Sequence, residues 1–172
     1  MLRSEDARRF AEIPFLSNLD EAALDAIAFA SETKILRRGE RLFTRGEPGN
    51  CAYVLITGRL ALSEGEDSEV QVKPGSLIGE MALLVDSERR STANAVEPSV
   101  VLLIPRNVFM RILKDHPASA VRLREFCAQR LCRSAPNEPM SLETQCDTTI
   151  KYKNWAALDH FALCVVHLDH AL

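Results

Sequence analysis

The chain has 172 residues, of which 47% are hydrophobic and 26% are charged, and its formal net charge is −3. This length fits about one domain with an appendage, and the apolar content excludes disorder over the whole chain. The small acidic excess argues against a surface committed to nucleic acid, because such surfaces are usually clearly basic.

The sequence carries no signal for secretion or membrane insertion. Its first residues lack the apolar core of a secretion signal, and no run of about 18 uncharged apolar residues occurs. The five cysteines are an odd number and form no Cys-x-x-Cys pair. We interpret them as free thiols and expect a cytoplasmic protein that does not bind membranes.

Residues 4–30 show the apolar spacing of helices, and Pro14 divides them into a short helix and a second one. Asn18 and Glu21 have the spacing of a capping box at the start of the second helix. We interpret both helices as packing elements at the edge of a core.

Between residues 33 and 104, short apolar or alternating runs are separated by glycines, and all seven glycines of the chain lie there. Glycine supplies the positive φ angles that tight turns require. Short strands with frequent turn signals predict a sandwich or a barrel. The predicted strands are 34–36, 41–43, 53–56, 59–62, 70–72, 92–96 and 100–104.

Helical periodicity returns after Pro105 and predicts two helices, over 106–114 and 118–133. A proline-containing linker follows, and the last residues are again apolar at helical spacing. We therefore predict one domain over 1–133, with a barrel at about 33–104 and C-terminal helices at 106–133, then a linker and a short apolar helix over 134–172. The role of this tail stays open between docking on the barrel, contact with another molecule, and disorder.

The most informative motif runs from Gly79 to Ala93. Its carboxylate is an acceptor suited to ribose hydroxyls, and its guanidinium groups are planar donors suited to phosphate. A ligand that carries both groups close together is a nucleotide. No catalytic base or nucleophile accompanies them, so the motif predicts binding and not hydrolysis. The candidate ligand-binding residues are Gly79, Glu80, Met81, Ala82, Arg89, Arg90 and Ser91.

The ordered glycines and this motif resemble the cyclic nucleotide-binding domain family, which includes catabolite activator proteins and the regulatory subunits of cAMP-dependent protein kinase. The similarity covers roughly residues 12–133 and is carried by stretches 15–19, 38–50, 53–58, 74–83, 89–93 and 101–106. The resemblance implies a mainly β fold, a double-stranded β-helix (jelly-roll) barrel with N- and C-terminal α-helices.

The resemblance also implies roles for single residues. Gly79 would let the backbone approach the sugar, and Glu80 would accept a hydrogen bond from the ribose 2′-hydroxyl. Ala82 would donate its backbone N–H to the phosphate at the start of a one-turn helix, where unpaired N–H groups attract anions. Arg89 would pair with the ring phosphate.

The arginine pair departs from the family pattern. Alignment from the downstream strand places Arg89 on the phosphate, whereas alignment with a longer loop places Arg90 there, followed by Ser91. We favour Arg89 and expect the other arginine to face solvent, Asp86 or Glu88.

The ligand expected from the resemblance is cAMP, with cGMP as the alternative, because neither alignment has a strong cGMP signal after the arginine. We expect no cofactor and no metal. The base is expected to contact barrel residues and the last helix, where Leu123, Phe126 and Arg130 are candidates.

Other activities receive little support from the sequence. The residues after Arg133 are too few for a helix-turn-helix domain, so we expect no sequence-specific DNA binding and a stand-alone sensor domain. His160, His167 and His170 are interpreted as the polar side of a helix and not as metal ligands. Cys51 is interpreted as a small packed residue, so we do not expect an enzyme.

Three functional hypotheses follow. The first is a cyclic nucleotide sensor that transmits binding through its C-terminal helices to a protein partner or to a second copy. The second is an interaction module that keeps the barrel and needs no ligand. The third is an enzyme such as a phosphodiesterase, and the absence of a metal-ligand cluster in the matching region counts against it.

Overall fold

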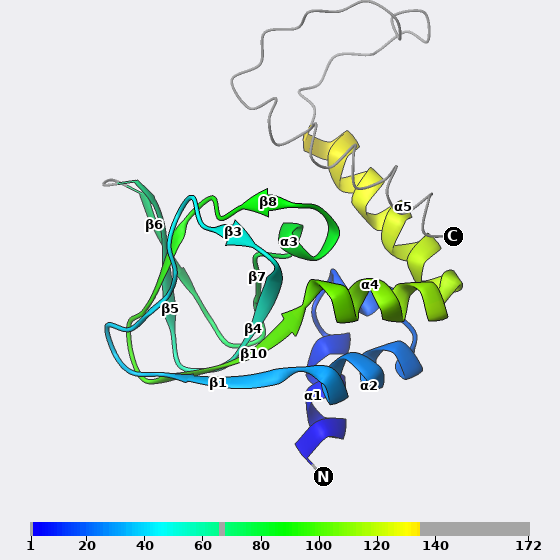
Figure 1. The fold of residues 1–172 in the computed structure, drawn as a ribbon, viewed down its shortest axis with the longest axis horizontal. Coiled ribbons are helices and arrows are strands. Elements are labelled where there is room, and N and C mark those ends of the chain that lie inside the picture. Colours follow the sequence, from blue (N-terminus) through cyan, green and yellow to red (C-terminus); the bar gives the residue numbers. More distant parts are fainter. Residues whose placement is uncertain (1, 66–67, 135–172) are drawn as a thin grey trace, which may run out of the picture.

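The computed structural model describes residues 2–65 and 68–134, and its centre is built from antiparallel β-strands (Figure 1). Two four-stranded sheets have the orders β1-β10-β4-β7 and β2-β9-β5-β6, and β3 pairs with β8. Except for β5 and β6, the paired strands are not consecutive in the chain, as in a jelly roll. The strands are β1 (Glu32–Leu36), β2 (Arg41–Phe43), β3 (Pro48–Gly49), β4 (Cys51–Thr57), β5 (Leu60–Gly65), β6 (Ser68–Val72), β7 (Leu77–Ile78), β8 (Ser87–Glu88), β9 (Thr92–Ala95) and β10 (Ser99–Pro105).

Helices α1, α2 and α4 gather at one end of the strands, and α5 leads away from them (Figure 1). The short helix α3 follows β7 and contacts α4. The helices are α1 (Leu2–Ala11), η1 (Leu16–Asn18), α2 (Glu21–Ala30), α3 (Met81–Leu84), α4 (Arg106–Asp115) and α5 (Pro117–Ser134). The mainly β fold with flanking helices is confirmed, whereas residues 135–172, with the predicted apolar tail, lie outside the described residues.

The start of α2 corrects one expectation from the sequence. The helix begins at Glu21, and the cap is Asp20, whose Oδ1 accepts a hydrogen bond from the Ala23 N–H at 2.8 Å. The predicted cap, Asn18, ends the preceding η1 turn, and its amide donates to the Pro14 carbonyl at 2.8 Å. The predicted capping box is wrong because the cap directly precedes the first helical residue, and Asn18 lies too early.

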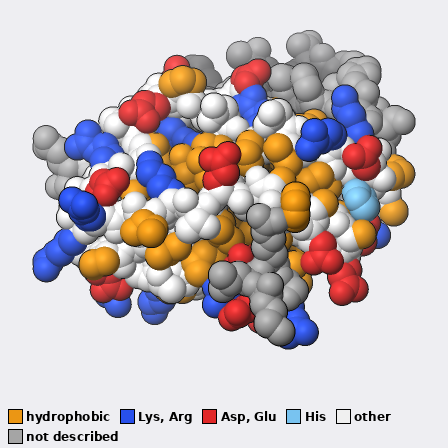
Figure 2. All heavy atoms as spheres, turned by 60° about the horizontal axis from the view of Figure 1, so that its bottom comes forward, with side chains coloured by type: hydrophobic (Ala, Val, Ile, Leu, Met, Phe, Trp, Pro, Cys, Tyr) orange, Lys and Arg blue, Asp and Glu red, His pale blue; other side chains and the backbone are white. Residues whose placement is uncertain are grey.

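The surface carries charges of both signs. Figure 2 shows one face, on which hydrophobic side chains gather near the middle and Lys, Arg, Asp and Glu side chains surround them. Among the described residues, Phe29, Ile35 and Val70 are large hydrophobic side chains with more than half of their area exposed. Isolated exposed apolar side chains are common on protein surfaces and need no special explanation.

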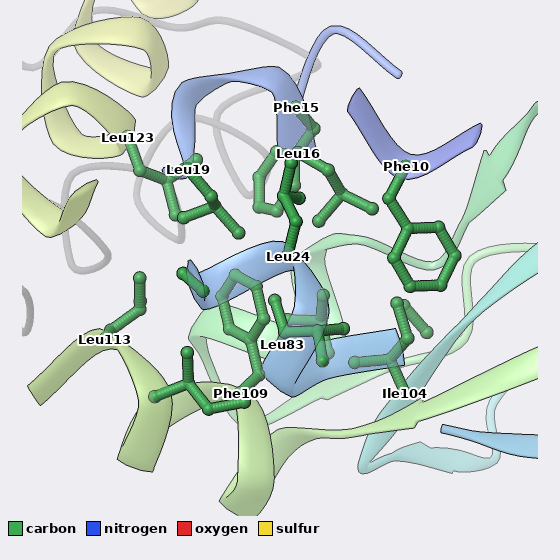
Figure 3. Packing of buried hydrophobic residues seen from close by; sticks show 14 of the residues in the cluster. Phe10, Phe15, Leu16, Leu19, Leu24, Leu83, Ile104, Phe109, Leu113 and Leu123 are labelled. Carbon is green, nitrogen blue, oxygen red and sulfur yellow. The ribbon is translucent and has the colours of Figure 1, made fainter. Parts of the chain in front are cut away.

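Strands β4 and β10 of the sheet β1-β10-β4-β7 are buried on both faces, so they separate two hydrophobic clusters. Side chains alternate along β4: Ala52 and Val54 lie in one cluster, and Tyr53 and Leu55 lie in the other. The first cluster joins the sheet to the helices and includes Leu83 of α3 (Figure 3). The second fills the barrel. The helix that carries the predicted site is therefore anchored in the helical core.

Candidate functional site

The chain between β7 and β9 surrounds a cavity of about 280 Å³. Strands β2 and β5 contribute Phe43 and Leu62 to its wall, two residues that the sequence did not single out because many barrel side chains share their pattern. All of the residues predicted to bind a ligand line this cavity: Gly79, Glu80, Met81, Ala82, Arg89, Arg90 and Ser91. The structure thus brings the predicted set together, and its contact with a ligand stays a prediction.

Position 79 is closely fitted to its neighbour Arg89. Gly79 has a φ of +75°, a conformation that residues with a Cβ rarely adopt. A Cβ built on Gly79 would lie 2.3 Å from Nη1 of Arg89. Glycine therefore meets a backbone requirement and leaves the space that the guanidinium occupies.

Arg89 is a buried cation, with 7% of its surface exposed. Its Nη2 donates to the Cys51 carbonyl at 2.8 Å and lies 3.3 Å from the Cys51 Sγ. The guanidinium carbon lies 4.5 Å from the ring centre of Phe43 and 5.4 Å from that of Tyr53, which are favourable cation–π distances. These contacts hold the planar group without neutralising its charge.

The other end of the guanidinium has no partner. Nη1 of Arg89 is buried without a hydrogen bond, and no carboxylate among the described residues forms a salt bridge with this side chain. Burial raises the pKa of the neighbouring Tyr53 phenol, with a further contribution from its hydrogen bond to Cys51, so no phenolate balances the charge at neutral pH. A buried cation without a salt-bridge partner is unfavourable and attracts an anion.

Arg90 differs from Arg89 although it lines the same cavity. Its side chain is exposed, whereas Arg89 is buried. Asp86, one of the partners expected for the second arginine, pairs instead with Arg106. The second arginine was expected to face solvent, Asp86 or Glu88. Solvent fits the exposed side chain of Arg90.

Helix α3 brings three further candidates to the cavity wall. Glu80 directly precedes the helix, is partly buried and forms no capping hydrogen bond with its side chain. Met81 is partly buried against the helical core. The Ala82 N–H, expected to face a phosphate, donates to the Gly79 carbonyl at 3.1 Å. An anion at this point would share or replace that hydrogen bond.

The residues expected near a base have different surroundings. Leu123 is fully buried in the helical core and is not part of the cavity wall. Phe126 lines a neighbouring cavity of about 510 Å³, which also includes Leu77 and Glu80. The side chain of Arg130 lies outside the described residues.

The structure bears on two further possibilities. Within residues 2–65 and 68–134, no three His, Cys, Asp or Glu side chains converge as metal ligands. His160, His167 and His170 lie outside this range. In the same part of the chain, no helix combines the length and apolarity needed to cross a bilayer.

Comparisons with known proteins agree with this geometry. A family model for the cyclic nucleotide-binding domain matches residues 33–116. A cyclic nucleotide-binding-like protein from Brucella abortus bv. 1 str. 9-941 is 34% identical in sequence, with a TM-score of 0.58 over 64% of this chain and 98% of that one. The N-terminal domain of a transcriptional regulator from Streptomyces coelicolor A3(2) is 25% identical, with a TM-score of 0.68 over 81% and 99% of the two chains.

A curated relative shows the same similarity in a longer protein. The cAMP-dependent protein kinase regulatory subunit of Hypocrea atroviridis is 33% identical over 102 residues, which are 59% of this chain and 22% of that protein. The chain spans only 8% and 9% of the length of two other relatives, the lysophospholipases NTE1 of Pyricularia oryzae and nte1 of Neurospora crassa. The similarity therefore concerns one domain of larger proteins.

Proposed function

The chain belongs to the cyclic nucleotide-binding domain family, and from this premise we propose that it is a regulatory sensor that binds cAMP in the cavity around Arg89. Binding of the phosphate by Arg89 is the central part of this proposal. The regulatory subunit from Hypocrea, a relative named for its dependence on cAMP, supports cAMP as the first ligand to test. Cyclic GMP is the second.

The unpaired Nη1 of Arg89 is the observation that carries the proposal. This nitrogen is buried beside a cavity, and its side chain has no carboxylate partner. A cyclic phosphate supplies one negative charge and two free oxygens, which suits the unused face of a guanidinium. The burial of Arg89 and the exposure of Arg90 support the assignment of Arg89 to the phosphate.

The position of α3 supports the proposed transmission to a partner. Leu83 of this helix packs in the same cluster as Phe109 of α4, so a shift of α3 bears directly on α4 (Figure 3). A ligand that binds one arrangement of these helices better than another shifts the population toward it. The partner that would read this shift is a protein or a second copy of the chain.

The test is calorimetric titration of the full chain, freed of bound nucleotide, with cAMP and with cGMP. Arg89→Ala is expected to weaken binding by about 2–3 kcal/mol, as for loss of a charge-assisted hydrogen bond to phosphate. Arg90→Ala is the matched control and is expected to change affinity much less. The opposite order would assign the phosphate to Arg90. No heat with either nucleotide would favour the ligand-independent interaction module.

Glu80 has a separate test on the ribose. Glu80→Ala is expected to weaken binding of cAMP by about 1.5–3 kcal/mol, because a carboxylate that accepts a hydrogen bond from the 2′-hydroxyl is lost. The variant and the wild-type chain are then compared with 2′-deoxy-cAMP, which has no 2′-hydroxyl. A smaller loss with the deoxy ligand is expected, whereas equal losses would remove Glu80 from the ribose.

A further inference from the structure

Arg106 is the first residue of α4, and its side chain contacts two other segments. Its Nε donates to the Ala82 carbonyl at 2.5 Å, and its Nη2 donates to the Gly49 carbonyl. Its Nη1 pairs with the Asp86 carboxylate, and its backbone N–H donates to the Asn50 carbonyl at 2.9 Å. One residue thus joins α4 to the turn between β3 and β4 and to helix α3 with the loop after it.

The two carbonyls held by Arg106 belong to segments that flank Arg89. A Cβ built on Gly49 would lie 2.9 Å from the Cβ of Ala82 and 3.6 Å from the Cζ of Arg89. Gly49 and Ala82 are therefore closely packed next to the buried guanidinium of Arg89. Arg106 itself is absent from the wall of the 280 Å³ cavity, so it can act on this cavity only through these segments.

The geometry requires an arginine. Two guanidinium nitrogens donate to neutral backbone carbonyls, and a third faces Asp86. The rigid, planar guanidinium presents several donors in fixed directions, whereas the single ammonium of a lysine cannot match all three acceptors at once. The Asp86 side chain is 99% exposed, so solvent screens its ion pair with Arg106. The hydrogen bonds to the two backbone carbonyls therefore contribute most to the position of the Arg106 side chain.

We infer that Arg106 is a positioning residue for the anion-binding part of the cavity. We call Arg106, Gly49, Ala82 and Asp86 together the Arg106 network. The network holds α3 against the β3–β4 turn so that Gly79, Ala82 and Arg89 keep their relative positions. Through this network, the start of α4 supports the wall of the cavity. The consequence for nucleotide affinity rests on the proposed function, whereas the mechanical role does not.

The first measurement is hydrogen–deuterium exchange of the full chain without nucleotide. Arg106→Gln is expected to speed exchange of the amides of residues 82–85 at least tenfold, and Arg106→Lys to give an intermediate rate. Arg122→Gln is the matched control, because Arg122 also donates from a helix to a backbone carbonyl, that of Asn18, at 2.8 Å. Unchanged exchange at 82–85 in the folded Gln or Lys variant would overturn the inference.

The second measurement is calorimetric affinity for cAMP. Arg106→Gln is expected to weaken binding at least tenfold, and Asp86→Asn to weaken it less, because both carbonyl bonds remain. Faster exchange with unchanged affinity would overturn the positioning role. Faster exchange in a chain whose wild type binds no cyclic nucleotide would uphold the mechanical role and reject the proposed function. If Arg106→Gln does not fold, the Lys and Asn variants decide both measurements.

Discussion

Gly79 and Arg89, ten positions apart in the sequence, define the centre of the candidate site. Gly79 and Arg89 fit one another: the glycine has no Cβ where Nη1 of the arginine lies, and the arginine places an unpaired cation beside the cavity. Phe43 and Tyr53 stack near the guanidinium and restrict its movement. At the scale of the residue, the candidate site is a buried guanidinium with one unpaired nitrogen.

Gly79→Ala is expected to damage both fold and binding. The new Cβ would force Arg89 to move, and an L-residue at this φ adds roughly 1–2 kcal/mol of strain. Gly39→Ala is the control, because Gly39 has a similar φ of +81° but no atom within 4 Å of its Cβ position. Thermal melts and cAMP titrations compare the two variants. If both lose the same stability and keep the same affinity, the fit between Gly79 and Arg89 has no role in binding.

At the scale of the element, Asp20 joins two helices. Its Oδ1 caps α2 by accepting from the Ala23 N–H, and its Oδ2 accepts from the Ser119 hydroxyl of α5 at 2.6 Å. The Asp20 N–H donates to the same hydroxyl oxygen at 2.9 Å, and Nδ1 of His116 lies 3.2 Å from Oδ1. Ser119 is fully buried. This cluster fixes the start of α5 against the N-terminal helices.

The cluster predicts a pH dependence of stability. The Ser119 hydrogen bond, followed by the Ala23 N–H and the charge of His116, lowers the pKa of Asp20, while desolvation opposes them. The ionised carboxylate therefore stabilises the fold above its ordinary pKa of about 3.9, and this contribution is lost as pH falls through the lowered value.

Asp20→Asn is expected to flatten the fall in unfolding free energy between about pH 5 and pH 2. Urea denaturation at a series of pH values measures this, with Asp25→Asn, an exposed position on the same helix, as the control. The effect is modest, because 38% of the Asp20 side chain is exposed and solvent screens it. A slope identical to that of the wild type would show that Asp20 does not link α2 and α5 through its charge.

At the scale of the whole molecule, one sheet separates a barrel core from a helical core, and α3 belongs to the helical one. Leu83 is fully buried with the side chains of α2, α4 and α5, while Leu55 is fully buried in the barrel. The cavity wall draws on both cores, because Phe43 and Ile78 belong to the barrel cluster and Met81 packs against the helical one. Changes in the helical core are therefore expected to reach the site, because they move α3.

Leu83→Ala and Leu55→Ala are each expected to lower the unfolding free energy by about 2–5 kcal/mol, the usual loss for a buried leucine. Only Leu83→Ala is expected also to weaken cAMP binding, since Leu83 is part of α3. Ile35→Thr, at a position 73% exposed, is expected to change stability by about 0.5 kcal/mol or less. Chemical denaturation and calorimetry measure the three variants. Equal cAMP affinity in the two leucine variants would show that packing of α3 in the helical core does not affect binding.

Much of the architecture could be predicted from local patterns. Alternating apolar residues and glycines indicated most of the strands, and the motif around Glu80 and Arg89 indicated part of the cavity wall but not Phe43 and Leu62. The two-residue strands β3, β7 and β8 were missed, because two residues show no alternation. The cap of α2 was misplaced, because Asn18 and Asp20 are both good caps in sequence and only the backbone path distinguishes them.

The sequence by itself determined the family, the order of strands and helices, and the residue types available to a nucleotide, because these depend on local spacing. Tertiary structure alone decided that Arg89 is buried while its neighbour Arg90 is exposed. It also decided that Arg106 holds carbonyls 24 and 57 residues away in the chain. Burial and long-range hydrogen bonds arise when distant segments pack together, and no local pattern encodes which of two adjacent arginines that packing covers.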